Sequence, residues 1–329
     1  MRRREFIALL TAATGAVALA VMPRKVAAQS YPARPITLIV PYPAGGGADT
    51  VARVTAEPMR AFLRQSVIIE NMGGASGGTG TGRLARAAPD GYTLGIGNWS
   101  THVVNAAVSV LPYDVLNDFV PVALLVRFPY VLVAKKNLPA NNLAELIAWL
   151  KANPNRASAG TIGVGSGGHL AGILFQSLTD TRFQHVPYRG NALALQDLLA
   201  GQIDFTFADQ SALALVRAGS VKALVVTSSE RFAAAPDIPT ADDAGLPGLS
   251  VASWNGVFAP KGTPEAIIGK LNDATVRALA EPAIVQKLAE LGYEVPPRDQ
   301  QTPEALGILQ KADIQKWWPI IKAAGIKAE

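Results

Sequence analysis

The chain has 329 residues, of which 49% are hydrophobic and 17% charged, a balance typical of a folded globular protein and not of a disordered one. It contains no cysteine, which excludes disulfides, thiol catalysis and cysteine-based metal sites. A chain of this length exceeds one ordinary hydrophobic core, so we expect two domains.

The N-terminal segment has the features of an export signal. Residues 1–10 give a basic region that leads into an apolar run ending near Met22, and Val26-Ala27-Ala28 fits a signal-peptidase site. The run is too short and too rich in small residues for a comfortable membrane-spanning helix, although a retained anchor stays open as an alternative. Because Arg3-Arg4-Glu5-Phe6-Ile7 resembles a twin-arginine motif, we predict that residues 1–28 are a twin-arginine-like signal peptide, with ordinary secretion as the alternative route. Either route delivers the protein to the periplasm.

Removal of this signal changes the charge of the protein. The signal holds five basic residues and one acidic residue, so it contributes +4 of the formal net charge of +5. The mature chain is therefore almost neutral. It carries no basic stripe of the kind that binds nucleic acid or an anionic membrane surface, and we expect neither as a partner.

Short apolar runs alternate with amphipathic stretches rich in Ala and Leu, which favours parallel βαβ units. The first part predicts strands at 36–40, 67–69 and 92–96 and helices at 49–63 and 81–88. The middle predicts strands at 130–134, 159–164, 183–186, 203–207 and 221–226 and helices at 143–151, 169–178, 192–200 and 212–217. The last part predicts a strand at 256–258 and helices that begin near Thr263 and Thr302.

The last part has too few strands for a sheet of its own, so we expect it to return to the first lobe. We predict an α/β protein with two lobes, each a mainly parallel sheet flanked by helices. Lobe 1 would comprise residues 29–125 and 252–329, and lobe 2 residues 126–251. The chain would cross between the lobes near 122–129 and near 250–255, which makes a hinge suited to closing on a ligand.

Four polar segments follow predicted strands, where open α/β sheets bind their ligands: residues 41–49, 73–80, 100–102 and 163–169. Three of them are glycine-rich turns that open onto helices. Glycine lets a ligand approach the backbone, and exposed N–H groups at a helix N-terminus bind anions without Arg or Lys. Any single loop could use glycine merely for a tight turn, but three such loops favour an anion cleft that suits a carboxylate.

Two enzyme hypotheses remain as alternatives. The segment Gly74–Gly78 matches the serine-hydrolase elbow around Ser76, but it lies inside a long glycine loop and needs a base from His102, His169 or His185. The segment Gly163–Gly168 matches the dinucleotide fingerprint, but the acidic residue expected about twenty positions later is missing. An exported serine hydrolase or nucleotide-cofactor-dependent oxidoreductase is therefore the alternative to a binding protein. We expect no cofactor and no metal site.

Asp209 follows a predicted strand and precedes a helix, so it either faces the cleft or caps that helix. If Asp209 faces a carboxylate ligand, an amine or a hydroxyl of the ligand or a bridging water would have to lie between the two negative charges. Tyr42 and Trp254 could wall a pocket, although aromatic residues at strand ends more often belong to a core.

Several collinear segments together resemble one family, the Bug proteins, which are periplasmic receptors of tripartite tricarboxylate transporters. The likeness covers essentially the whole mature chain, and a set of collinear segments is far more specific than one glycine motif. The segments are residues 35–46, 70–77, 88–94, 111–114, 118–122, 185–190 and 201–204.

The resemblance implies a type II periplasmic-binding-protein (Venus-flytrap) fold and no catalysis. It implies a receptor that binds a small mono- or dicarboxylate, aliphatic or aromatic, through backbone amides and ordered waters. The partners would be the membrane subunits of a tripartite transporter, and the receptor would be a monomer; an exported sensor partner would bind the same ligands. Carried over residue by residue, the ligand contacts are Tyr42, Ala44, Gly45, Gly46, Gly77, Gly78, Thr79, Ser100 and Thr101 from the first lobe and Ser166, Gly167, Gly168, His169 and Asp209 from the second. Family members usually have a Gly- or Ser-rich segment where this chain has Asn98-Trp99-Ser100. The bulky Trp99 either shapes the pocket or packs in the core.

Overall fold

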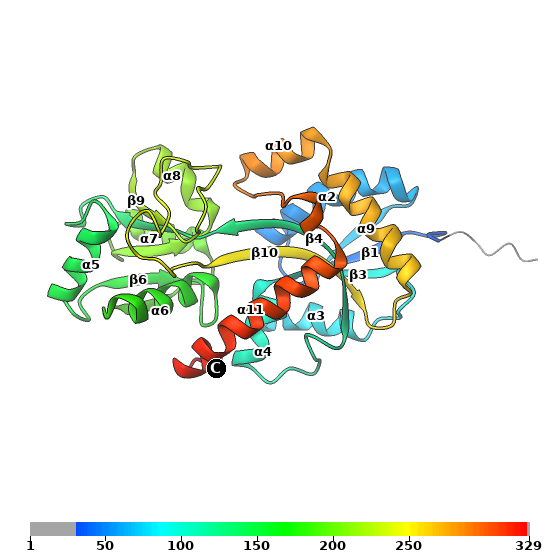
Figure 1. The fold of residues 1–329 in the computed structure, drawn as a ribbon, viewed down its shortest axis with the longest axis horizontal. Helices are drawn as coiled ribbons and strands as arrows, with labels where there is room; N and C mark the ends of the chain where they lie inside the picture. Colours follow the sequence, from blue (N-terminus) through cyan, green and yellow to red (C-terminus); the bar gives the residue numbers. More distant parts are fainter. Residues whose placement is uncertain (1–30, 328–329) are drawn as a thin grey trace, which may run out of the picture. The chain divides into compact units, whose positions relative to one another are not determined.

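The computed structural model describes residues 31–327, so the predicted signal peptide lies outside the described residues. From Arg34 onward the chain forms one compact unit. Its described part contains two five-stranded sheets, each covered by helices (Figure 1).

The first sheet has the strand order β2-β1-β3-β10-β4. Its strands are β1 (Ile36–Val40), β2 (Val67–Asn71), β3 (Thr93–Asn98), β4 (Phe119–Pro129) and β10 (Ala252–Pro260). Strand β1 pairs in parallel with β2 and β3, whereas β10 is antiparallel to both β3 and β4. The helices and helical turns that follow these strands in sequence are α2 (Gly47–Leu63), η1 (Ala75–Gly77), α3 (Gly78–Ala85), η2 (Ser100–Val104), α4 (Asn105–Val108), α9 (Glu265–Leu279), α10 (Pro282–Glu290), η4 (Arg298–Gln300) and α11 (Pro303–Ala323).

The second sheet has the order β7-β6-β8-β5-β9 and repeats the same pairing pattern. Its strands are β5 (Val131–Lys135), β6 (Ser158–Thr161), β7 (Gln184–Pro187), β8 (Phe205–Ala208) and β9 (Val221–Val226). Strand β6 is parallel to β7 and β8, and β5 is antiparallel to β8 and β9. Its helices are α5 (Leu143–Ala152), α6 (Gly167–Thr179), α7 (Asn191–Leu199), η3 (Gln210–Ala212) and α8 (Leu213–Arg217). The predicted two-lobed α/β fold is confirmed, with one antiparallel strand inside each otherwise parallel sheet.

Two helix starts differ from the sequence expectation. Helix α2 begins at Gly47, two residues before the predicted start, and α3 begins at Gly78, three residues before it. In both helices the N-cap is itself a glycine and makes no side-chain capping bond. The usual N-cap signal, a Ser, Thr, Asp or Asn, is therefore missing from the sequence at these two positions.

Strands β4 and β10 connect the two sheets. They pair along nearly their whole length and lie side by side in Figure 1. Strand β4 ends at Pro129 and β5 begins at Val131, so Tyr130 alone separates strands of different sheets. The sequence predicts a much shorter β10 and no strand at β4.

Thr227 joins the two places where the chain passes between the sheets. Its side chain is fully buried, and its hydroxyl oxygen accepts a hydrogen bond from Tyr130 N (3.0 Å) and donates one to Val251 O (2.6 Å). Its backbone N–H donates to Tyr130 O (2.8 Å), and its carbonyl accepts from Val251 N (3.0 Å). Both connections are therefore held to each other at one residue.

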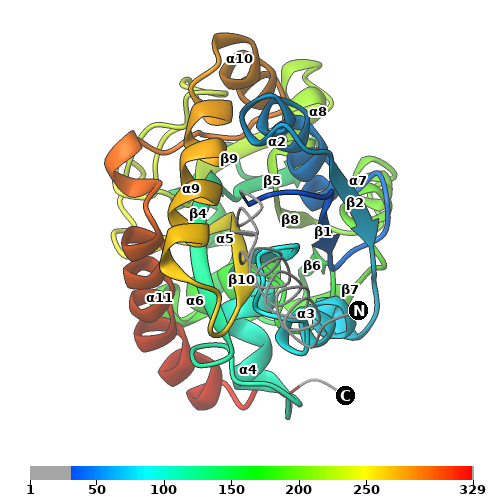
Figure 2. The ribbon, with the colours of Figure 1, turned by 90° about the vertical axis from the view of Figure 1, so that its right-hand side faces the viewer.

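The C-terminal helices pack on the first sheet. Helices α9 and α11 lie on the same side of β4 and β10 (Figure 2). Side chains of α11 hold this packing: Gln310 Nε2 donates to the carbonyl oxygens of His102 (3.0 Å) and Val115 (2.9 Å). Trp99 is fully buried and meets Trp317 of α11 edge to face, so it packs in the core and does not wall a pocket. No helix within residues 31–327 is both long enough and apolar enough to cross a membrane.

Candidate functional site

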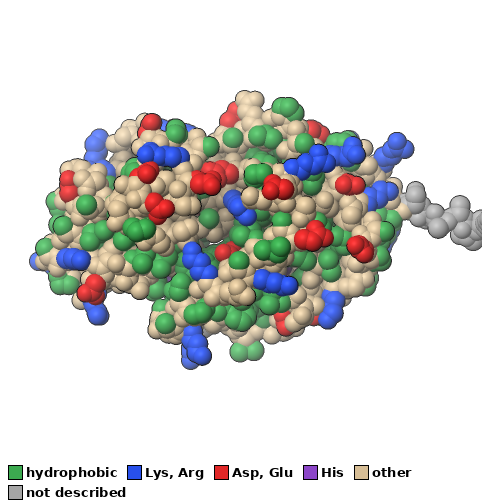
Figure 3. All heavy atoms as spheres, in the orientation of Figure 1, with side chains coloured by type: hydrophobic (Ala, Val, Ile, Leu, Met, Phe, Trp, Pro, Cys, Tyr) green, Lys and Arg blue, Asp and Glu red, His purple; other side chains and the backbone are tan. Residues whose placement is uncertain are grey.

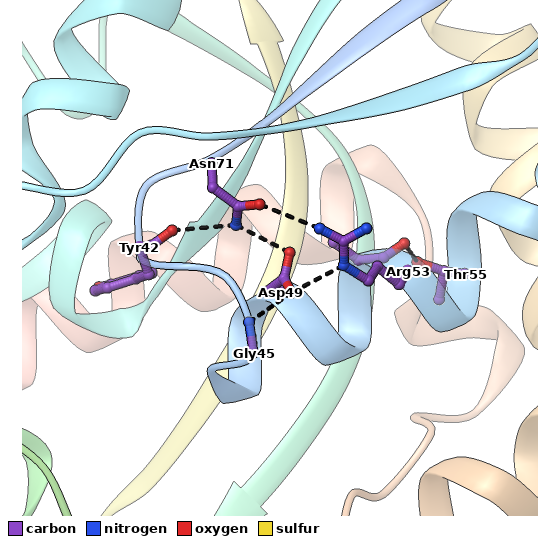
Figure 4. Close-up of polar contacts among 7 residues, drawn as sticks. Tyr42, Gly45, Asp49, Arg53, Thr55 and Asn71 are labelled. Carbon is purple, nitrogen blue, oxygen red and sulfur yellow. Dashed lines mark hydrogen bonds and ion pairs between the residues drawn. The ribbon is translucent and has the colours of Figure 1, made fainter.

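The loop between β1 and α2 is held in shape by a carboxylate from its own helix (Figure 4). Asp49 Oδ2 accepts the N–H of Gly45 (2.8 Å) and Nε of Arg53 (2.9 Å). Asn71 at the end of β2 donates from Nδ2 to Asp49 Oδ1 (2.9 Å) and to the carbonyl oxygen of Tyr42 (3.2 Å). The conformation of residues 42–45 is therefore fixed within the first sheet.

The charge of Asp49 is stabilised by its partners. Its side chain is only 3% exposed, and the hydrogen bond from Arg53 is the main cause that lowers its pKa to about 2. Burial opposes this effect, and the bonds from Gly45 and Asn71 add to it. Arg53 is thus bonded to Asp49, and the donors that the loop offers to a ligand are neutral backbone N–H groups.

Three loops of the first sheet meet at Tyr42. Its hydroxyl accepts a hydrogen bond from Asn98 Nδ2 (3.0 Å), and Asn98 Oδ1 accepts the N–H of Thr101 (2.9 Å). A Cβ atom on Gly77 would lie 2.6 Å from Thr101 Cγ2 and 3.3 Å from the Tyr42 hydroxyl. The structure therefore brings together the predicted residues Tyr42, Gly77 and Thr101, and adds Asn98, which the sequence did not single out.

Two helices begin at this place without a side-chain cap. Helix α2 has the exposed Gly46 as its N-cap, and α3 has Gly77, whose φ of +90° suits glycine. The N–H groups of an uncapped first turn, together with the helix dipole, attract an anion. Ala44 and Thr79 are exposed beside these turns, and Gly78 and Ser100 are half-buried.

Thr101 is fully buried, and its hydroxyl bonds within its own turn. The hydroxyl oxygen accepts the N–H of Asn98 (3.0 Å) and lies 2.9 Å from His102 Nδ1. His102 stacks on Phe258 (4.0 Å between ring centroids), and burial lowers its pKa to about 3, so the ring is neutral. Thr101 and His102 therefore support the loop from the core side.

The loop between β6 and α6 is built in a different way, with a capping side chain. Ser166 Oγ donates to Gly163 O (2.7 Å) and accepts the N–H of His169 (3.4 Å), while Gly165 N donates to His169 Nδ1 (3.3 Å). Gly168 lies against the carbonyl of Phe207, where a Cβ atom would not fit. The hydroxyl of Ser166 and the ring of His169 thus both fix the loop.

His169 is 8% exposed and contacts His185 edge to face, with 4.7 Å between ring centroids. Gln176 Nε2 donates to His185 Nε2 (2.9 Å). Burial lowers the pKa of both rings, to about 4 for His185, where repulsion from His169 adds to the effect. Neither ring carries a positive charge at neutral pH.

Asp209 lies where the two sheets approach each other. Its Oδ1 accepts the N–H of Ser211 (3.0 Å), so it does cap the turn that follows β8. Its charge also acts on Tyr130 and Tyr293, although burial is the main cause that raises the pKa of each hydroxyl, to about 12 for Tyr293. Both tyrosines stay protonated at neutral pH, and sequence reasoning identified neither.

Each of the three glycine loops packs against a tyrosine hydroxyl. The partners are Gly77 with Tyr42, Gly47 with Tyr293 (2.6 Å from a hypothetical Cβ) and Gly167 with Tyr130, whose ring overlaps the Cβ position. Tyr130 belongs to the connection between the sheets, and Tyr293 to the segment after α10. Tyrosine packing therefore favours glycine at positions 47 and 167, whereas at Gly77 the positive φ and the contact with Thr101 do so. These reasons are visible only in the tertiary structure.

The enzyme hypotheses receive no support from this geometry. Ser76 lies on an exposed turn, and the three histidines of the chain bond to Thr101, Gly165 and Gln176. Among the described residues there is no group of three His, Cys, Asp or Glu side chains that could hold a metal ion.

The sequence matches the family model described as the tripartite tricarboxylate transporter family receptor over residues 51–326. Among solved structures, it is 39% identical to MatC from Rhodopseudomonas palustris with bound malate, covering 88% of this chain and 100% of MatC at a TM-score of 0.79. The periplasmic binding protein BugD is 36% identical, covering 91% of this chain and 100% of BugD at a TM-score of 0.79. An R. palustris protein with adipate is 34% identical, covering 90% of this chain and 99% of that protein at a TM-score of 0.80. These structures confirm the predicted fold class, and the family is one of solute receptors, not enzymes.

Replacing Gly167 by Ala should destabilise the protein by about 1–3 kcal/mol, because the added methyl group overlaps the Tyr130 ring. Gly269 is the matched control, since it is exposed on α9 with no atom near its Cβ position. Gly269→Ala should be neutral or stabilise by up to about 1 kcal/mol. Urea unfolding of both variants measures the difference, and equal effects would contradict the tyrosine packing described here.

Replacing Asp49 by Asn should lower the free energy of unfolding at pH 7 by about 1–2 kcal/mol, since Arg53 is partly exposed and screened. Because the pKa of Asp49 is lowered from 3.8 to about 2 in the folded state, its stabilisation is complete above pH 4. It is lost as the pH falls toward 2, so the two proteins should converge there. Asp273→Asn, on the exposed surface of α9, should cost little at any pH. The measurement is the free energy of unfolding of both proteins between pH 7 and pH 2. A difference that stays constant over this range would rule out this role.

Proposed function

Because the chain belongs to the tripartite tricarboxylate transporter receptor family, we propose that it is a periplasmic receptor that captures a small mono- or dicarboxylate for such a transporter. The uncapped N-terminus of α2, held through Tyr42 beside the glycine loop that leads into α3, is the observation that carries the proposal. The relatives with malate and adipate support the ligand class.

One carboxylate group would rest on residues 42–46 and 77–79, with Ser100 and Thr101 behind them. The donors there are the N–H groups in the first turn of α2, because those of Gly77, Gly78 and Thr79 already bond to the carbonyls of Gly74 and Ala75. Neither segment contains Lys or Arg. Burial raises the pKa of Tyr42 to about 12, so its hydroxyl stays protonated. It would donate to the carboxylate in place of its contact with Asn98 Oδ1 (3.2 Å). A carboxylate gains charge-assisted hydrogen bonds there without an opposing buried cation.

The second lobe would read the distal end of the ligand through residues 166–169 and Asp209. The first turn of α6 supplies N–H groups from Gly167 and Gly168, with Ser166 and His169 holding that turn in place. Asp209 would accept a hydrogen bond from a ligand hydroxyl or from a bridging water through Oδ2, because its capping bond uses Oδ1.

The remaining parts of the proposal concern location and partners. The predicted signal peptide of residues 1–28 supports a periplasmic receptor, which we propose acts as a monomer that delivers its ligand to membrane subunits. The relative BugD, a periplasmic binding protein, supports the same location.

Calorimetric titration against aliphatic and aromatic carboxylates should give saturable binding for at least one dicarboxylate. The dimethyl ester of that ligand should bind about 100-fold more weakly, because it loses the charged acceptors of the helix N-termini. A thermal-shift series with the same compounds provides an independent readout. No heat and no shift with any carboxylate would refute the proposed function.

Replacing Asp209 by Asn should reduce the preference for malate over succinate about tenfold, because a charged acceptor for the hydroxyl is lost. The amide oxygen can still cap Ser211, so the fold should be kept. Asp237→Asn, at an exposed position, is the matched control and should leave the preference unchanged. The ratio of the two dissociation constants is the measurement, and an unaltered ratio in Asp209→Asn would remove Asp209 from the contacts.

A further inference from the structure

A separate cavity of about 170 Å³ lies between β4, β10 and α11. Arg127 reaches it from β4, Trp254 from β10, and Asp313 and Lys316 from α11. The rest of its lining is Ser250, Ala252, Ser253, Leu309 and Trp317. None of these residues belongs to the glycine loops of the carboxylate site. Basic and acidic side chains gather near the middle of the face that carries α11 (Figure 3).

The side chains that line this cavity include two cations, Arg127 and Lys316, and one carboxylate, Asp313. Asp313 Oδ2 accepts the indole N–H of Trp254 (2.8 Å), and Lys316 Nζ donates to Ser250 O (2.7 Å). Arg127 Nε is buried and has no hydrogen-bond partner. Within residues 31–327, neither Arg127 nor Lys316 forms an ion pair with a carboxylate. Two cations thus face one carboxylate that already has a partner.

The Arg127 guanidinium needs an acceptor at this place. A buried donor without a partner destabilises the folded state, and more so when it is charged. Asp313, Glu230 and Glu294 act on Arg127 only through longer-range electrostatics, and burial lowers its pKa in spite of them. An anion in the cavity would place a negative charge next to both lining cations, Arg127 and Lys316.

The volume limits the size of the occupant. At about 30 Å³ per water molecule, the cavity has room for roughly five waters, which is less than ordinary ligand pockets offer. We propose that the cavity is a second anion site, which binds a small monovalent anion, a short-chain monocarboxylate or a halide, between Arg127 and Lys316. This site is independent of the carboxylate site between the glycine loops.

The position of the site connects it to the hinge. Arg127 precedes Tyr130 by three residues, and its backbone N–H and C=O pair with Glu294 O (2.8 Å) and N (2.9 Å), next to Tyr293. Ser250 precedes Val251, which is bonded to Thr227. An anion there contacts both segments that connect the sheets, together with α11.

Iodide quenching of tryptophan fluorescence tests the proposal, because Trp254 and Trp317 line the cavity. At constant ionic strength, iodide should quench part of the emission saturably. Formate should displace it, while neutral formamide should not; chloride in a parallel titration tells whether halide or carboxylate binds better. Arg127→Gln should weaken saturable quenching at least tenfold, and Lys316→Gln should weaken it as well.

Arg156→Gln is the matched control, since Arg156 is exposed and its removal changes the net charge by the same amount. It should leave the saturable component unchanged. Thermal unfolding shows whether each variant is folded, and Lys316→Gln carries the test if Arg127→Gln is not. Strictly linear quenching in the parent, quenching that formate does not relieve, or equal losses in Arg156→Gln would each overturn the proposal.

Discussion

The hydrogen bonds of Thr227 are the interaction on which the arrangement of this protein depends. They fix Tyr130 and Val251 to each other, at the two places where the chain passes between the sheets. Because Tyr130 is held by its backbone, its ring is placed against Gly167 and so determines where α6 begins relative to β4. Val251 in turn leads directly into β10, whose Trp254 is bonded to α11. One buried hydroxyl thus connects the two crossings between the sheets with the second-lobe loop and the C-terminal helix.

The electrostatics of the candidate site favour anion binding by neutral donors. Arg53 is bonded to Asp49, and burial keeps His169 and His185 uncharged. Burial also raises the pKa of Tyr42 and Tyr293, so that their hydroxyls stay protonated. The remaining donors are backbone N–H groups at helix starts and hydroxyl groups. Such a site recognises a carboxylate by geometry and leaves the rest of the ligand to the surrounding surface.

Much of the fold was predictable because its signals are local. The strand at Ile36–Val40 is apolar and β-branched, and the amphipathic period of α2 indicates a helix. The starts of α2 and α3 were predicted wrongly, and the reason is also local. Gly46 and Gly77 stand where a capping Ser, Thr, Asp or Asn would mark the start of a helix. Trp99 was ambiguous in sequence, since a large aromatic residue after a strand suits a pocket and a core equally. Its contact with Trp317, more than 200 positions away, is what resolves it.

The fold class, the family and the positions of the glycine loops could be predicted from the sequence. Their signals are the alternation of apolar and amphipathic stretches, the turn residues and the collinear motifs, which are all properties of neighbouring residues. Tertiary structure decided what surrounds those loops. Tyr130 and Tyr293 come from segments with no motif of their own. Asn71 belongs to the segment 70–77, but its bond to Asp49, and the bond of Asp49 to Gly45, follow only from the fold. The two anion-binding sites proposed here likewise depend on groups that are far apart in the sequence. One uses helix starts, and the other uses the Arg127 guanidinium. Such contacts are set by packing, which no local pattern encodes.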